Sequence, residues 1–335
     1  MEVCPEQSAL LCNVWRAACH QYRFDRVAMA TQKMKWTGPD FVVIGAAKAG
    51  TTAIWSWLRT HPDLFLPDVK EPGYFAFADR DPRPSRGPFD PKYISSITTK
   101  WSAYGALYQY SAGRKCGDVS PVYAVSETAL PRLRSCRPDT RIVMVLRHPA
   151  RRAFSQYLHH RRDALEPLDT FEAALAAERS RQKQGWSWAH AYAGGSNYLP
   201  QIQRLMGNFP RQQILFLEHE AIRATPEVCW HRLCKFLGVA TPPMPDNQMV
   251  NVTEGLVATP SRPFFERMVR HPGSLQKKLK RVLPGSARSA IRKVLSGRSV
   301  PVATLSTDTA RQIMRLYKAD LPDLRARTGL PLHWT

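Results

Sequence analysis

The sequence predicts an α/β fold, a doubly wound parallel sheet with helices on both faces. Two apolar runs carry this prediction, FVVI at 41–44 and RIVMVLR at 141–147, because strands buried on both faces of a parallel sheet read as continuous hydrophobic segments. Each run is followed by a segment with helical periodicity, and alternation of strands with helices favours β-α-β units. The 335 residues are 44% hydrophobic, which is enough for a sizeable core.

The remaining elements follow in chain order. After the first strand, a helix begins near Thr51 and stops by Pro62, with apolar residues at i, i+3 and i+4. Residues 79–92 are proline-rich and predict a loop. Pro149 can open the helix after the second strand. We also expect a strand at 212–218, a helix near 226–237 and a closing helix from about 307 to 321.

We expect a leader of uncertain structure at 1–37 and a single domain at 38–335. Seven cysteines are an odd number without C-x-x-C spacing, which favours free thiols over a disulfide framework or a zinc site. No uncharged apolar run of 18 residues is present, and the start lacks a basic leader with a cleavage site, so we expect a cytoplasmic protein.

The charge predicts acidic partners. A net charge of +21 with a pI near 10.0 suits nucleic acid, an anionic membrane or a polyanionic small molecule, and charge alone does not choose among them. Residues 262–298 hold eleven Lys or Arg and one acidic residue, Glu266. A solvated basic face is the alternative interpretation of that segment.

The loop GAAKAGTT at 45–52 predicts an anion site. Gly45 and Gly50 keep the four-residue gap of a nucleotide-triphosphate P-loop, but Lys48 lies inside the loop and Thr51 takes the usual lysine position. Backbone N–H groups of such a loop bind anions at the positive end of the following helix. Lys48 adds a cation, and Thr51 and Thr52 add hydroxyl groups. An ordinary strand-to-helix turn is the alternative.

A second anion site is predicted where the second strand ends. Arg147 lies at the carboxyl end of a parallel strand, where α/β proteins bind ligands, and Ser155 follows about two helical turns later. An arginine fork and a hydroxyl suit a phosphate, although a salt bridge at the sheet edge is equally compatible. No acidic residue ends this strand to hold Mg²⁺, which disfavours a kinase.

Together, the two sites resemble the sulfotransferases that use 3′-phosphoadenosine 5′-phosphosulfate (PAPS), closest to the carbohydrate, heparan-sulfate-like branch and its bacterial relatives. The resemblance covers roughly residues 40–335. It rests on KAGTT (48–52) and RHPARRAFSQY (147–157), and it continues through KEPGYFA (70–76), GDVSPVY (117–123), NYLPQIQRL with ILFLEHEAI (197–222) and YKADLPDLRARTGLPLHW (317–334).

This resemblance implies the cofactor and its contacts. The cofactor would be PAPS, with adenosine 3′,5′-bisphosphate as product and no metal required. Residues Lys48, Ala49, Gly50, Thr51 and Thr52 would hold the 5′-phosphosulfate, and Arg147 and Ser155 would hold the 3′-phosphate. The basic segment 262–300 would cover the cofactor and place Arg298 near the 3′-phosphate, and Tyr198 is a candidate for stacking on adenine.

The resemblance also implies catalytic roles. Lys48 would stabilise charge on the departing nucleotide, and Glu71 would take the proton of the acceptor, although Glu71 could instead simply pair with Lys70. Asp118 is a weaker acceptor-side candidate. Val119 stands where heparan sulfate enzymes often carry lysine, which weakens the case for a highly sulfated polymer.

The function that follows is transfer of a sulfuryl group from PAPS to a hydroxyl or amine of a carbohydrate or small-molecule acceptor. A P-loop nucleotide or small-molecule kinase is the alternative enzyme. A basic protein that binds nucleic acid or a membrane surface is the alternative of another class. We expect no nucleic-acid partner, whereas peripheral contact with a membrane or a lipid-linked acceptor is compatible with catalysis.

Overall fold

The computed structural model describes residues 36–245, 256–258, 299–301 and 304–334. The predicted leader at 1–37 and the basic segment at 262–300, with Arg298, lie almost wholly outside these ranges and stay predictions. Within the described ranges, no helix is both long and apolar enough to cross a membrane. The four cysteines that are described, Cys116, Cys136, Cys229 and Cys234, are reduced thiols.

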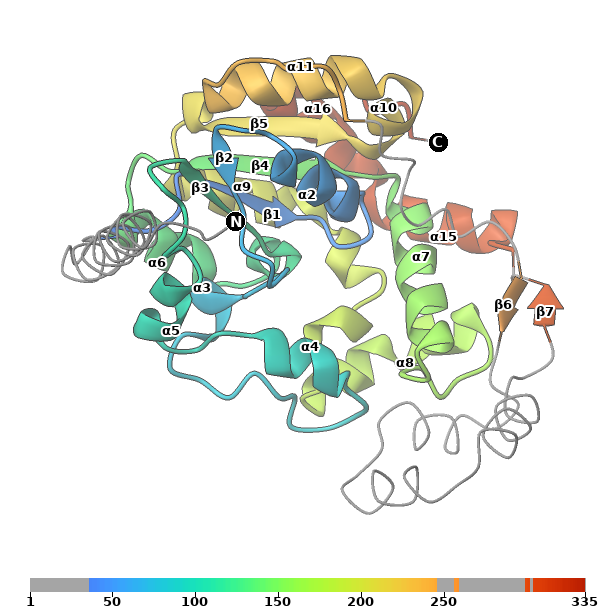
Figure 1. The fold of residues 1–335 in the computed structure, drawn as a ribbon. Coiled ribbons are helices and arrows are strands. Elements are labelled where there is room, and N and C mark those ends of the chain that lie inside the picture. The colour runs from blue at the N-terminus through green and yellow to red at the C-terminus, as the bar shows by residue number, and fades with distance from the viewer. Residues whose placement is uncertain (1–35, 246–255, 259–298, 302–303, 335) are drawn as a thin grey trace, which may run out of the picture. The chain divides into compact units, whose positions relative to one another are not determined.

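A five-stranded parallel sheet forms the centre of the domain (Figure 1). Its strands are β1 (Phe41–Gly45), β2 (Leu64–Phe65), β3 (Lys115–Val119), β4 (Arg141–Leu146) and β5 (Ile214–Glu218), in the order β2-β3-β1-β4-β5. β1 therefore lies between β3 and β4, the point at which the strand order reverses. This confirms the predicted doubly wound fold, and ligands bind at the carboxyl ends of strands at such a point.

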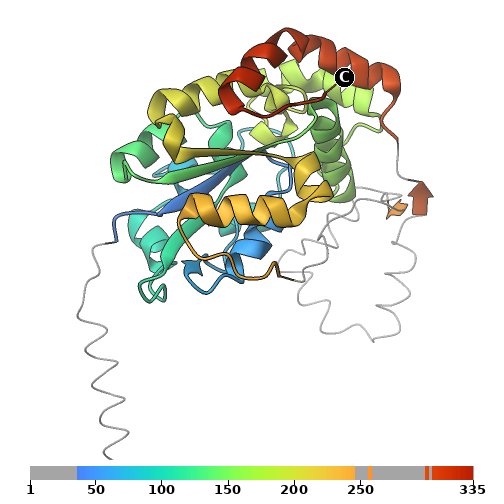
Figure 2. The ribbon, with the colours of Figure 1, turned by 90° about the horizontal axis from the view of Figure 1, so that it is seen from above.

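Helices cover both faces of the sheet. In Figure 2, α2 and α11 lie on one face, and α9 and α16 lie on the other. The helices are α2 (Thr51–Arg59), α3 (Tyr74–Phe77), α4 (Pro91–Ser96), α5 (Trp101–Ala106), α6 (Ala129–Cys136), α7 (Pro149–Arg162), α8 (Phe171–Lys183), α9 (Tyr198–Asn208), α10 (His219–Ala224), α11 (Pro226–Leu237), α15 (Thr307–Tyr317) and α16 (Leu321–Thr328). Two further strands, β6 (Leu256–Ala258) and β7 (Ser299–Pro301), pair antiparallel.

The core explains why the central strands carry continuous apolar runs. All five residues of β1 and the last five of β4 are buried, so neither face of the central sheet meets water. In β3, the ring of Phe41 packs on Gly117, where an added Cβ would lie 2.1 Å from a ring carbon. Glycine at this position lets the two strands and the ring fit together.

The predicted elements were confirmed with small shifts at their ends. Both strands that carried the prediction, the strand before α10, and helices α2, α7, α11 and α15 all lie where expected. The proline-rich loop ends slightly early, because Pro91 occupies the first turn of α4 and Asp90 caps it. The short strands β2 and β3 were not predicted.

Candidate active site

A cleft of about 980 Å³ opens at the carboxyl ends of the central strands. Its walls are formed by five segments: the loop after β1, the start of α2, the segment before α3, helix α7 and the 3₁₀ turn η2 (Trp188–His190). Most of the predicted site residues line it: Lys48, Gly50, Thr51, Thr52, Glu71, Arg147 and Ser155. Ala49 is fully buried beneath the loop and does not line the cleft.

The loop after β1 has the geometry of an anion cradle. Gly50 takes φ +98°, and a Cβ there would lie 3.0 Å from Nδ1 of His219, so this position needs glycine. His219 donates from Nδ1 to the carbonyl of Ala49 at 3.1 Å, which fixes the loop from beneath. Helix α2 has neither a side-chain cap nor an acidic residue in its first turn, so its N-terminal N–H groups suit an anion.

Lys48 lies where positive charge is concentrated. Burial, together with the neighbouring charges of Arg162, Arg147 and Lys70, lowers the pKa of its ammonium group to about 8, while the charge of Glu71 opposes this shift. An anion bound beside Lys48 would stabilise the charged ammonium group, because it would offset both the cost of burying that charge and the repulsion from the neighbouring cations.

Glu71 is paired with the residue before it. Lys70 donates from Nζ to Glu71 Oε1 at 2.8 Å and to Thr52 Oγ1 at 3.0 Å. Lys70 thus joins the predicted base to the predicted anion loop, and its pairing with Glu71 is the one that was considered as the alternative to catalysis. Both charged side chains line the cleft, so the pairing leaves Glu71 within reach of a ligand.

Asp118 is not an acceptor-side group. Its side chain is fully buried, and its carboxylate accepts hydrogen bonds from the hydroxyls of Ser120, Tyr104 and Tyr123 at 2.6, 2.6 and 2.8 Å. Burial raises its pKa. Ser120 in turn accepts from the backbone N–H of Gly73 at 3.1 Å. Asp118 therefore anchors the segment that carries Glu71 and does not reach the cleft.

Arg147 connects the two predicted anion sites. Its guanidinium donates to the carbonyl of Lys48 at 2.7 Å, so the end of β4 holds the loop after β1. The Nε of Arg147 is buried without a hydrogen-bond partner among the described residues. Arg151 and Arg223 line the same cleft and were missed by the sequence analysis. Arg151 could have been found, since it lies one helical turn before Ser155.

Tyr198 does not offer a stacking face to a cofactor. It is buried, its hydroxyl donates to the carbonyl of Arg147 at 2.9 Å, and its ring packs near Trp334 at 5.8 Å. Its role is to support the end of β4 from the core. Among the described residues, no cluster of three His, Cys, Asp or Glu side chains is arranged to hold a metal ion.

The model of the sulfotransferase family matches residues 39–243. Heparan sulfate glucosamine 3-O-sulfotransferase 3B1 of Homo sapiens is 28% identical over 205 residues, which cover 60% of this chain and 46% of that protein. Bifunctional heparan sulfate N-deacetylase/N-sulfotransferase 4 of Mus musculus is 25% identical over 359 residues, covering 99% of this chain and 34% of that protein.

A solved structure is also similar. The crystal structure of a sulfotransferase from Alicyclobacillus acidocaldarius matches with a TM-score of 0.59 and 31% identity, covering 65% of this chain and 87% of that one. The chain spans less than half the length of the curated relatives described above.

Proposed function

Because the chain belongs to the sulfotransferase family, we propose that it transfers a sulfuryl group from PAPS to a hydroxyl or amine of a carbohydrate. One observation carries the choice of donor: Arg147, at the end of β4, is bonded to the carbonyl of Lys48 in the loop after β1, which joins two cationic sites in one cleft. A nucleotide with phosphates at both its 3′ and 5′ positions matches two such sites. The carbohydrate acceptor is suggested by the names of the heparan sulfate relatives.

The residues present fit this donor. The first turn of α2 and the hydroxyls of Thr51 and Thr52 suit the 5′-phosphosulfate, with Ala49 and Gly50 shaping the loop. Ser155 and the buried, unpartnered Nε of Arg147 suit the 3′-phosphate. PAPS supplies the activated sulfuryl group.

The chain's own residues would supply two effects. Lys48 Nζ holds positive charge beside the bridging oxygen on which negative charge develops, so it stabilises the transition state more than the ground state. Glu71 removes the proton of the acceptor hydroxyl or amine as the new bond to sulfur forms. Lys70 is hydrogen-bonded to both Glu71 and Thr52. It thereby holds the proposed base at a fixed position relative to the loop that would bind the donor.

Adenosine 3′,5′-bisphosphate is the ligand that tests this proposal. We expect calorimetry to detect its binding with EDTA present, because the two anion sites are made of backbone N–H groups, hydroxyls and cationic side chains. The matched comparison is ATP with Mg²⁺. Binding of ATP with Mg²⁺, and no binding of the bisphosphate, would instead support the kinase alternative.

Replacing Arg147 by alanine should weaken the bisphosphate and spare adenosine 5′-phosphate. Loss of a charge-assisted hydrogen bond costs about 1.5–3 kcal/mol, or roughly 10- to 150-fold in affinity. Calorimetry with both nucleotides measures the difference. Because Arg147 also holds the carbonyl of Lys48, Ser155→Ala is the control that leaves this contact intact and should show the same selectivity with a smaller loss. Equal weakening of both nucleotides in both variants would contradict the assignment of the 3′-phosphate.

A further inference from the structure

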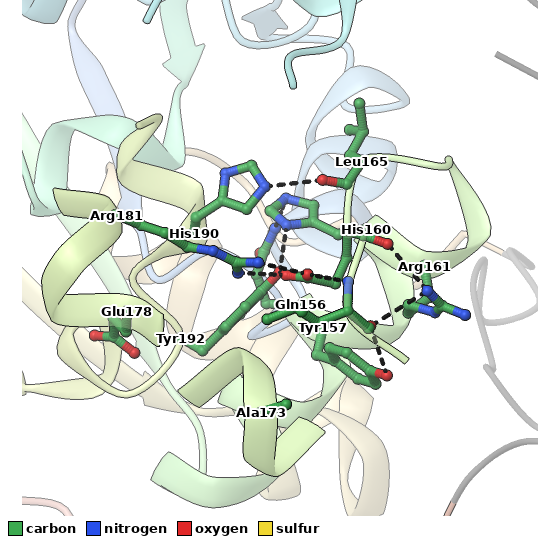
Figure 3. Close-up of polar contacts among 12 residues, drawn as sticks. Gln156, Tyr157, His160, Arg161, Leu165, Ala173, Glu178, Arg181, His190 and Tyr192 are labelled. Atoms are coloured by element: carbon green, nitrogen blue, oxygen red, sulfur yellow. Dashed lines mark hydrogen bonds and ion pairs between the residues drawn. The ribbon is translucent and has the colours of Figure 1, made fainter. Parts of the chain in front are cut away.

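Figure 3 shows a chain of polar side chains, all buried, that runs from Arg181 to Gln156. Arg181 donates to both carboxylate oxygens of Glu166 at 2.7 and 2.8 Å, and the hydroxyl of Tyr192 donates to Glu166 Oε2 at 2.7 Å. His160 Nδ1 lies 2.9 Å from the oxygen of Tyr192, and its Nε2 lies 2.8 Å from Nε2 of Gln156. All five side chains are buried, and the last two residues line the cleft.

These contacts determine which atom donates and which accepts in each hydrogen bond. The hydroxyl of Tyr192 donates a hydrogen bond to Glu166, so the Tyr192 oxygen can only accept a hydrogen bond from Nδ1–H of His160. Nε2 of His160 then carries the lone pair and accepts from the amide N–H of Gln156. Burial keeps the pKa of His160 well below its ordinary value, so the ring stays neutral at physiological pH. The ion pair of Arg181 and Glu166 thereby fixes the orientation of the neutral His160 ring and of the Gln156 amide at the wall of the cleft.

His190 lies beside this chain and has an acceptor atom to spare. Its Nε2 lies 3.0 Å from the carbonyl of Leu165, and only an N–H can bond to a carbonyl, so Nε2 carries the hydrogen. Its Nδ1 is therefore a lone-pair acceptor. That atom is buried and has no hydrogen-bond partner in the described part of the chain, and the residue is 2% exposed. The ring centroid lies 4.4 Å from that of His160.

A buried acceptor without a partner costs free energy, so an acceptor in the wall of a cleft points to a donor that arrives with a ligand. His190 lines the cleft that also contains Lys48 and Glu71. Leu165, Ser187, Trp188 and Ala189 line the same cleft, and so do the cationic residues Lys48, Arg151 and Arg162. Burial lowers the pKa of His190 as well, so this wall offers a neutral acceptor next to an aromatic surface.

We propose that His190 Nδ1 accepts a hydrogen bond from a second hydroxyl of the acceptor molecule, and that His190 is a residue that selects a polyhydroxylated ring over an apolar alcohol. The inference rests on the proposed function and narrows its substrate class. Sugar rings present hydroxyl hydrogens at their rim and C–H groups on their faces, which match a lone-pair acceptor beside Trp188.

Two substitutions of His190 separate ligand binding from structure. His190→Gln places an amide N–H where Nε2–H stands, so it keeps the bond to the carbonyl of Leu165 and removes the acceptor at Nδ1. His190→Asn keeps an acceptor near Nδ1 and removes the bond to Leu165. The probes are methyl β-D-glucopyranoside and cyclohexylmethanol, titrated by NMR into protein saturated with adenosine 3′,5′-bisphosphate.

In the wild-type protein, methyl β-D-glucopyranoside should bind more tightly than cyclohexylmethanol. His190→Gln should weaken it about tenfold, the loss of one hydrogen bond, and leave cyclohexylmethanol, the bisphosphate and the Tm unchanged. His190→Asn should lower the Tm and retain the preference for the glucoside. Failure of the wild-type complex to prefer the glucoside, or equal affinity in wild type and His190→Gln, would overturn the inference. The proposed function fails separately, if the bisphosphate itself does not bind.

Discussion

Replacing Glu71 by glutamine is expected to lower the rate of sulfuryl transfer by about 10²–10⁴-fold, the usual contribution of a general base. Glutamine keeps the shape of the side chain, and its amide oxygen can still accept from Nζ of Lys70, so the contact of Lys70 with Thr52 survives. Affinity for adenosine 3′,5′-bisphosphate should therefore stay near wild type. Single-turnover kinetics with labelled PAPS and a saturating glycan acceptor, together with calorimetry, measure the two quantities.

Glu127→Gln is the matched control for this variant, because Glu127 is an exposed glutamate that does not line the cleft. It should leave both rate and affinity unchanged. Near-normal turnover of Glu71→Gln would remove Glu71 from the mechanism. His148 would then be the next residue to test, since it lines the cleft, whereas the burial of Asp118 keeps that carboxylate from touching an acceptor.

Lys48→Met should lower both the rate and the affinity for the bisphosphate. Loss of one positioned charge at a developing oxyanion costs about 10²–10³-fold in rate. The affinity should also lose a pH dependence that the wild type shows. The pKa of Lys48 is about 8 in the free protein, so the cation is present below this pH and is lost as the pH rises through it. A bound phosphate favours the charged form, and wild-type affinity should therefore fall from about pH 7.5 to 9.5.

Calorimetry across that pH interval checks the Lys48 prediction. The terminal phosphate of the ligand ionises near pH 6, so it contributes little change above pH 7. Lys48→Met should give a nearly flat profile from pH 7.5 to 9.5. The same decline in both proteins would show that another group titrates, and Lys48 would no longer account for it.

The sequence predicted those parts of the molecule whose residues are contiguous. The loop at 45–52 and the pair Arg147 and Ser155 lie on single segments, each at the end of a strand that is apolar throughout. Their spacing therefore encodes the turn and is the basis of the predicted anion sites. Strand β3 was missed because Lys115, Gly117 and Asp118 interrupt any apolar run, and Gly117 makes sense only against the ring of Phe41.

Residues that act across long separations could not be predicted in the same way. His219 supports the loop after β1 from 170 positions along the chain, through a single bond to the carbonyl of Ala49. The wall containing His160 and His190 depends on α7, α8 and the segment around Tyr192 packing together, and no periodic pattern links them. Asp118 is only a weaker acceptor-side candidate on the sequence, which shows its charge but not its burial.

Lys48 and Glu71 share one backbone feature, φ angles of +68° and +61°, which glycine adopts far more readily than residues with a Cβ. Each such residue strains the chain by roughly 1–2 kcal/mol. At both positions, the stability of the fold therefore favours glycine, whereas the proposed chemistry requires lysine at 48 and glutamate at 71. We expect a laboratory selection for thermal stability alone to enrich glycine at positions 48 and 71. The selected proteins would be more stable but would lack the proposed sulfuryl-transfer activity. Any stabilised variant of this chain should therefore be selected under a simultaneous demand for turnover.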